Sequence, residues 1–336
     1  MSNPDNPSPP RVRASGVGSW PGTNVREAMI TVRDLLGEDL PYLPELPARG
    51  PGADLLGRTS ALLVDMPVDL QPAGWRLVDR PGRDAQRTAT LWREDLDELA
   101  EAYDGWTGDL KVSVAGPWTL AAGLALTRGE SVLADPGATR DLVQSLAEGV
   151  RVHVRDVTRL VPGAAIVLQI DEPSLTPVLQ GTLATQSGFS RIPAVPPGDA
   201  IDGLRTVLDA ADGRATVVHS CHPRPPVPVL RAAGAGAVSV DINLIGPADW
   251  ESIAAGVESG TGLYAGVLAT DGGQDRTQAV DGLLRAWDKV GLEVSFLGGV
   301  VTTPACGLAG ASVESARSIT RTCCDLARDL TDRMNR

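Results

Sequence analysis

The sequence predicts a single (β/α)8 barrel, a TIM barrel of the α/β class. Short strand-like runs alternate with helical runs along nearly all of the 336 residues. This alternation is the pattern of repeated βα units, and no linker-like stretch divides it. A single barrel of this kind is routinely this long. An open, doubly wound sheet is the alternative architecture.

Each expected strand is a short apolar run, often β-branched and bounded by turn residues, as in buried strands of parallel sheets. The expected strands are Ser15–Gly18, Pro41–Pro44, Val112–Ala115, Ile166–Ile170, Thr216–His219, Ala237–Asp241, Leu263–Leu268 and Val294–Val301. Apolar residues at helical spacing predict helices at Val25–Leu36, Ala53–Val64, Asp95–Tyr103, Thr119–Thr127, Arg140–Leu160, Ala200–Ala211, Pro226–Ala233, Trp250–Gly256, Arg276–Val290 and Ser312–Met334.

Two longer segments interrupt the alternation, Asp65–Arg93 and Thr176–Gly198. Each leaves the carboxyl end of a strand or the helix just after it, so we expect either a cover over a site or plain surface decoration. Residues 1–14 are rich in Pro, Ser and Arg and are expected to form a disordered lead-in, with the barrel occupying residues 15–336.

Composition excludes several classes of function. The 42 acidic and 30 basic residues give a net charge of −12, which argues against a nucleic-acid partner. No stretch approaches the roughly 18–20 apolar residues that cross a membrane. The first residues have no apolar segment typical of a secretory signal. Four cysteines do not make a disulfide scaffold in a chain of this size, so we expect a reducing cytoplasm.

Metal-binding residue types stand where predicted strands end. His219 and Cys221 follow one apolar run, Asp241 follows the next, and Cys306 comes shortly after the last strand. Parallel α/β sheets carry their chemistry just past the carboxyl ends of the strands. An imidazole, two thiolates and a carboxylate brought together there can form a tetrahedral zinc site. The alternative is that the cysteines are small apolar core residues.

The remaining cysteines and one histidine have a simpler explanation. Cys323 and Cys324 are adjacent in a predicted helix and point about 100° apart, so they cannot both face one metal. We interpret them as core residues. His153 lies inside another predicted helix without a metal-type partner nearby, and we interpret it as a helix-face histidine.

Other strand ends offer groups that could hold a substrate. Asp171 and Glu172 follow a strongly apolar strand; Asp171 could satisfy backbone amides in a turn, with Pro173 starting a helix, or it could receive a substrate ammonium. Ser19, between glycines at the end of the first strand, suits a ligand carboxylate. Trp118 follows the third strand and could offer a flat wall to a ring. A helix start explains each segment equally well.

Taken in chain order, these segments resemble the carboxyl-terminal catalytic barrel of cobalamin-independent methionine synthase. That barrel belongs to a superfamily with uroporphyrinogen decarboxylase and the corrinoid-linked methyltransferases. The resemblance spans nearly the whole chain and is carried by Gly18-Ser19-Trp20-Pro21, Gly116-Pro117, Gln169-Ile170-Asp171-Glu172-Pro173, His219-Ser220-Cys221, Asp241 and Cys306-Gly307-Leu308.

The resemblance implies that zinc is the cofactor and that homocysteine is the thiol substrate. It assigns the metal to His219, Cys221, Asp241 and Cys306. It further implies that Ser19 and Asp171 contact the amino-acid part of homocysteine, and that Glu45 receives the same ammonium group.

The chain also departs from the family. The family usually has glutamate where this chain has Asp241, and a histidine of a proton relay is missing from Gly266–Asp271. Asp271 could replace it as the acid. The family's pterin-stacking tryptophan is matched by Gly123, with Trp118 displaced.

The sequence therefore predicts a zinc-dependent methyltransferase that methylates a thiol, with homocysteine giving methionine. The methyl donor stays open between methyltetrahydrofolate, a methylated corrinoid protein as partner, and another methyl compound. The alternatives are a uroporphyrinogen-decarboxylase-like enzyme and a zinc- or thiol-binding barrel without methyl transfer.

Overall fold

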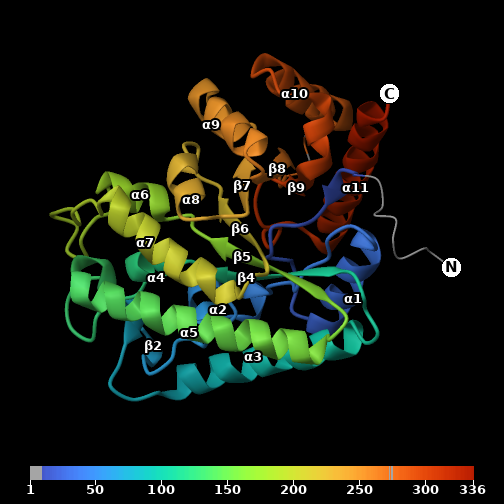
Figure 1. The fold of residues 1–336 in the computed structure, drawn as a ribbon. Helices are drawn as coiled ribbons and strands as arrows, with labels where there is room; N and C mark the ends of the chain where they lie inside the picture. Colours follow the sequence, from blue (N-terminus) through green and yellow to red (C-terminus); the bar gives the residue numbers. More distant parts are fainter. Residues whose placement is uncertain (1–9, 272, 274) are drawn as a thin grey trace.

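The computed structural model describes residues 10–271, 273 and 275–336. Its centre is a seven-stranded parallel sheet that curls on itself, with helices around the outside (Figure 1). The strands, in their order across the sheet, are β1 (Arg13–Ala14), β9 (Val300–Pro304), β8 (Gly262–Leu268), β7 (Ala237–Asp241), β6 (Ala215–Ser220), β5 (Ala165–Asp171) and β4 (Asp109–Ala115). The first and last strands of the chain are therefore neighbours, and the carboxyl-terminal helix packs beside both.

The segment 40–45 closes the sheet into a barrel. On one side, the Leu40 N–H donates to Ala14 O at 3.0 Å. On the other, the Leu43 N–H donates to Lys111 O of β4 at 2.9 Å. Parallel bridges join Ser19 to Glu45 and Tyr42 to Lys111. Isolated bridges thus stand at the place of the second predicted strand, Pro41–Pro44, and the (β/α)8 fold class is confirmed.

Helices cover the outer face of the sheet. They are α1 (Val25–Leu36), α2 (Leu55–Ser60), α3 (Arg83–Ala102), α4 (Pro117–Gly123), α5 (Pro136–Leu160), α6 (Leu175–Gln180), α7 (Pro197–Leu208), α8 (Val227–Ala232), α9 (Pro247–Glu258), α10 (Arg276–Lys289) and α11 (Val313–Met334). The two ends of α1 show how the local sequence sets the bounds of a helix. Asn24 caps α1 by accepting from the Glu27 N–H at 3.1 Å, and Gly37 ends it at a φ of 51°. No helix of the described residues is long and apolar enough to cross a membrane.

Two layers of side chains fill the barrel interior. The lower layer is a small apolar cluster, separate from the larger core between sheet and helices, and consists of Leu40, Val167, Val217, Ala237, Tyr264 and Val301. Side chains two residues apart on a strand share a face. The next inward positions are therefore Gln169, His219 and Ser239, all buried. A polar layer thus lies directly above the apolar plug, towards the carboxyl ends of the strands.

Four sequence expectations need correction. The lead-in does not extend to residue 14, because Arg13–Ala14 form β1 and Val12 is buried; residues 1–9 lie outside the described part. Val294–Gly299 is a 3-10 helix rather than strand, with Val294 and Phe296 exposed. Asp65–Arg93 is not wholly extended, because it holds a hairpin, β2 (Val68–Gln71) and β3 (Gly74–Leu77), and the start of α3. Thr176–Gly198 includes most of α6 and the start of α7.

Candidate functional site

The barrel brings three of the four predicted metal ligands together. His219 is the second-last residue of β6, Cys221 directly follows that strand, and Cys306 comes two residues after β9. Their ligand atoms all lie within 4.8 Å of one another. The three residues are 87 positions apart at most in sequence but meet because β6 and β9 end on the same rim of a closed barrel.

A serine on the next strand orients the histidine. The Nδ1 atom of His219 lies 3.1 Å from the Oγ atom of Ser239, and both side chains are buried. This hydrogen bond leaves Nε2 as the ring nitrogen available to a metal. Metal-binding histidines in proteins commonly have their second nitrogen fixed by such a partner.

The two sulfur atoms share a negative charge unequally. A hydrogen bond from the Cys221 thiol, followed by one from His219, lowers the pKa of Cys306 to about 4. The same hydrogen bond, together with burial, raises the pKa of Cys221. One thiolate is therefore stabilised before any metal binds.

Asp241 stands at the edge of this cluster. It is the last residue of β7, but its carboxylate is not among the grouped ligand atoms. Its Oδ1 atom accepts hydrogen bonds from the backbone and side-chain nitrogens of Asn243, at 2.9 and 3.2 Å. Partial burial raises the pKa of Asp241, and Cys306 and His219 both act on it electrostatically. Its role as fourth ligand stays a prediction.

The donor set fits zinc. One imidazole nitrogen and two sulfurs are the ligand types that zinc prefers. Zinc bonds of about 2.0–2.3 Å place tetrahedral donor atoms roughly 3.5–3.8 Å apart, which lies inside the 4.8 Å limit of this cluster. His219, Cys221 and Cys306 could therefore hold the ion with small side-chain movements.

The predicted amino-acid contacts lie on the same side of the barrel. Asp171 ends β5, and Glu45 is joined to Ser19 by a parallel bridge. Both carboxyl groups are buried, and burial raises the pKa of each. His219 acts electrostatically on Asp171, so the Asp171 carboxylate is close to the cluster of histidine and cysteine side chains.

Ser19 is packed against the segment that follows Cys306. The Leu308 N–H donates to Ser19 O at 2.9 Å, and the Ala309 N–H lies 3.4 Å from Ser19 Oγ. A β-carbon at Gly307 would lie 2.1 Å from Ser19 Oγ, so only glycine allows this approach. Ser19 therefore couples the first strand segment to the loop that carries Cys306.

The two acids of the Asp171-Glu172 pair have different surroundings. Glu172 is 0% exposed and accepts the backbone N–H groups of Trp118 and Thr119, each at 2.9 Å, and the Thr119 hydroxyl at 2.7 Å. It caps α4, which has no capping side chain of its own. Glu172 rather than Asp171 therefore accepts the backbone N–H groups of this turn, and the contact of Asp171 with a substrate stays a prediction.

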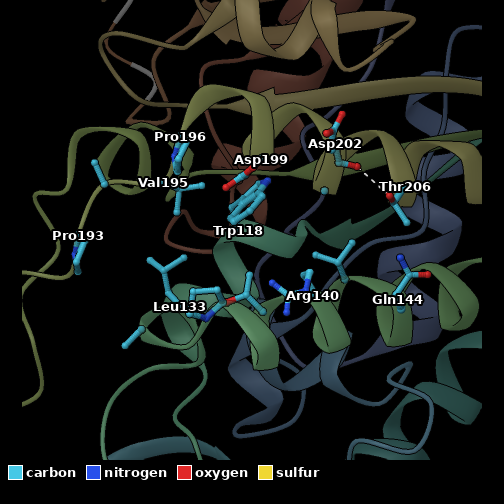
Figure 2. A pocket seen from close by; sticks show the side chains of 16 residues that line it. Trp118, Leu133, Arg140, Gln144, Pro193, Val195, Pro196, Asp199, Asp202 and Thr206 are labelled. Carbon is cyan, nitrogen blue, oxygen red and sulfur yellow. Dashed lines mark hydrogen bonds between the residues drawn. The ribbon is translucent and has the colours of Figure 1, made fainter.

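Trp118 lies in the helix layer. It is 3% exposed, and its indole N–H donates to Ala200 O at 3.0 Å. Figure 2 shows it at the base of a groove of about 470 Å³ between α5 and α7. The indole packs there as a core side chain, a position that does not favour the predicted contact with a cofactor at the barrel mouth.

Asp271 follows β8 on an exposed loop and accepts the Gly273 N–H at 3.0 Å. Residues 272 and 274 of this loop lie outside the described part. The loop leaves the carboxyl end of the barrel, so the predicted acid is on the correct side, and its role stays a prediction.

Sequence reasoning missed three polar residues of the barrel interior. Lys111 is 1% exposed in the middle of β4, Arg58 of α2 is buried against Glu45, and Ser239 supports His219. Polar residues at alternate positions of otherwise apolar strands were the available signal for Lys111 and Ser239. No short-range pattern marks Arg58.

Together these features define a (β/α)8 enzyme with a histidine–dicysteine donor set beside buried carboxylates at the carboxyl ends of its strands. The model of the cobalamin-independent synthase catalytic domain matches residues 12–329. The chain belongs to this family and is a methyltransferase.

One of the solved structures that match this chain has the same fold. A B12-independent methionine synthase from Shewanella sp. W3-18-1, in complex with selenomethionine, is 12% identical with a TM-score of 0.64, covering 97% of this chain and 99% of that one. The carboxyl transferase domain of Rhizobium etli pyruvate carboxylase matches with a TM-score of 0.32 at 14% identity, over 71% and 36% of the two chains. A Cellulomonas fimi endo-beta-1,4-mannanase matches with 0.39 at 13% identity, over 68% and 58%. No curated protein matches significantly.

Proposed function

We propose that this chain methylates the thiol of homocysteine to give methionine, at a zinc ion held by His219, Cys221, Cys306 and Asp241. The observation that carries the proposal is the grouping of one imidazole and two sulfurs within 4.8 Å, next to the buried Asp171. Family membership supports the methyl transfer. The Shewanella enzyme, of similar length, holds selenomethionine, the selenium analogue of the proposed product.

Zinc in such a set would lower the pKa of a bound thiol and leave its sulfur nucleophilic. The chain's own residues would set up this chemistry. Ser239 fixes the ring of His219, and the Cys306 side chain is already biased towards the thiolate. Asp241 stands outside the three-residue cluster, and we propose that it is the ligand that yields when the substrate sulfur arrives.

The buried acids would hold the amino-acid end of the substrate. Asp171 and Glu45 are two buried carboxylates whose charge Arg58 and Lys111 compensate only in part, and uncompensated charge is unfavourable in a poorly solvated place. A substrate ammonium between them would compensate this charge. Ser19, whose Oγ atom accepts from the Ala309 N–H, would donate its hydroxyl to the substrate carboxylate.

The transfer itself balances simply. The sulfur lone pair forms the new S–CH3 bond, and the electron pair of the broken methyl bond stays with the donor. The thiol proton is released. With methyltetrahydrofolate as donor, the departing nitrogen takes up a proton, for which we propose Asp271 as the acid. With a methylated corrinoid protein, the electron pair stays on cobalt, which goes from Co(III) to Co(I), and no acid is needed. In both cases positioning supplies most of the remaining rate acceleration.

The test combines metal content with isotopic methyl transfer. The purified chain should carry one zinc and should move labelled methyl from one of the two donors to homocysteine. A chain that binds zinc and thiol but returns the thiol unchanged would be a binding protein. A chain that takes up no metal would refute the proposal.

Cys306→Ser should lose zinc, because a hydroxyl is a far poorer zinc ligand than a thiolate. Cys324→Ala is the matched control, since Cys324 is buried in α11 against Leu35 O and should leave zinc stoichiometry unchanged. Full zinc occupancy in Cys306→Ser would contradict the assignment.

A further inference from the structure

A buried lysine lies beneath the proposed substrate site. Lys111 is 1% exposed, in the middle of β4. It is one of only two lysines among the 30 basic residues of the chain, the other being the exposed Lys289. A chain that uses arginine almost everywhere thus has a lysine at its most enclosed cationic position.

The ammonium group of Lys111 uses all three of its donors. Its Nζ atom donates to Gly16 O and Val17 O, each at 2.8 Å, and to the side-chain oxygen of Gln169. A compact ammonium directs its three donors tetrahedrally, whereas all donors of the larger guanidinium lie in one plane. The geometry therefore accounts for lysine rather than arginine here.

This lysine fixes the orientation of the Gln169 amide. Because the Oε1 atom accepts from Lys111, the Nε2 atom must face the other way. There it donates to Asp171 Oδ1 at 2.8 Å and to Val17 O at 2.7 Å. A reversed amide would set donor against donor at Lys111 and acceptor against acceptor at Asp171. The order Lys111, Gln169, Asp171 is thus a directed chain of hydrogen bonds.

The same lysine supplies positive charge to both buried acids. Its cation lowers the pKa of Glu45 and of Asp171, against the larger effect of burial, which raises both. Burial in turn lowers the pKa of Lys111 to about 8, while the two acids oppose that shift. Arg58 supports Glu45 from the other side, with Nη1 3.4 Å from its carboxylate.

We infer that Lys111, acting through Gln169, is a positioning residue that fixes the Asp171 carboxylate and provides its counter-charge, and thereby makes the site select thiols that carry an α-ammonium group. The inference rests on the proposed function, since it names what distinguishes the thiol substrate. Without Lys111, the Oε1 atom of Gln169 loses its donor, so the amide is fixed only through its Nε2 atom, and Asp171 loses its neighbouring cation.

The test compares two thiols that differ in one group. L-Homocysteine carries the α-ammonium, and 4-mercaptobutyrate is the same molecule without it. Binding of each to the zinc-loaded 336-residue chain is measured by calorimetry for the unmodified protein, Lys111→Met and the matched control Lys289→Met. Lys111→Met should weaken homocysteine binding at least tenfold and 4-mercaptobutyrate binding less than twofold. Lys289→Met should change neither.

A merely structural lysine would give a different result. If Lys111→Met weakens both thiols equally, or neither, the inference is wrong. Should that variant fail to fold, Gln169→Glu keeps the acceptor for Lys111 but replaces the donor towards Asp171, and the same selective loss is expected. If the unmodified protein binds neither thiol, the proposed function is wrong as well. If the unmodified protein prefers homocysteine and the variants bind both thiols as well as it does, only the role of Lys111 is wrong.

Discussion

Asp171 and Glu172 are adjacent acids, and the structure predicts opposite consequences when each is made an amide. Glu172 accepts three hydrogen bonds from Trp118 and Thr119 at the start of α4. In Glu172→Gln one side-chain oxygen remains, and the new NH2 group faces the donors of Thr119. One backbone N–H then loses its acceptor, while the Thr119 hydroxyl can rotate.

The expected loss of stability follows from the number of hydrogen bonds that Glu172→Gln breaks. An unsatisfied buried donor costs about 1–3 kcal/mol, and hydrogen bonds to a charged acceptor are stronger than neutral ones. Relaxation is restricted, because a β-carbon at Gly116 would already lie 2.2 Å from Glu172 Oε1, so the backbone is packed closely against this carboxylate. We expect Glu172→Gln to lower the free energy of unfolding by about 2–4 kcal/mol.

Asp171→Asn should behave in the reverse way. Its Oδ1 atom can still accept from Gln169, and the change removes a charge whose pKa burial raises. We expect the free energy of unfolding to stay within about 0.5 kcal/mol or to rise, as is common when a buried functional charge is removed. Homocysteine binding should fall at least tenfold, because an ammonium loses a carboxylate partner.

Urea denaturation followed by circular dichroism measures the stability of both variants, and calorimetry measures thiol binding. The experiments are done at pH 8, because burial raises the pKa of Glu172 to about 7 and its carboxylate must be ionised. Glu258→Gln, at an exposed site in α9, is the matched control. A stable Glu172→Gln protein that no longer binds homocysteine would refute the division of roles.

Two further predictions concern histidines. Ser239→Ala should weaken zinc binding about 10–100-fold in chelator competition, because Ser239 fixes the ring of His219; unchanged affinity would show that the ring needs no such partner. His153 is buried against Trp92, and burial lowers its pKa to about 3, so its contribution to stability is present above pH 6.5 and is lost as the pH falls. When the pH falls from 7 to 5, the free energy of unfolding should decrease by roughly 2 kcal/mol less in His153→Leu than in the unmodified protein. An equal decrease in both proteins would contradict a neutral buried imidazole.

The parts of the fold that the sequence predicts well are those encoded by local patterns. Ala237–Asp241 and Val25–Leu36 have the predicted bounds, because an uninterrupted apolar run and a capped amphipathic stretch need no tertiary information. Val294–Gly299 alternates apolar and polar residues like a strand, yet two glycines and an exposed Phe296 accompany a 3-10 turn. The hairpin of β2 and β3 was missed because its short strands, Val-Asp-Leu-Gln and Gly-Trp-Arg-Leu, contain no continuous apolar run.

The candidate site divides in the same way. His219, Cys221 and Cys306 could be recognised because residue type and strand-end position are both visible in the sequence. Lys111 could not be assigned a partner, because Gly16 and Val17 lie 95 and 94 positions away along the chain. Its contacts exist only once the segment 40–45 closes the barrel and brings the chain after β1 next to β4.

Barrel closure therefore does more than bury apolar surface. It places a polar layer with a cation directly above a dry apolar plug, at a depth where charges on side chains are poorly screened by solvent. In that layer the carboxylates of Glu45 and Asp171 are held by Arg58, Lys111 and Gln169 rather than by water. Acids held in this way need little reorganisation when a cationic group arrives, which is the condition for strong and selective electrostatic binding. The sulfur cluster at the rim and the carboxylates are positioned by different hydrogen-bond networks, Ser239 with His219 for the first and Lys111 with Gln169 for the second.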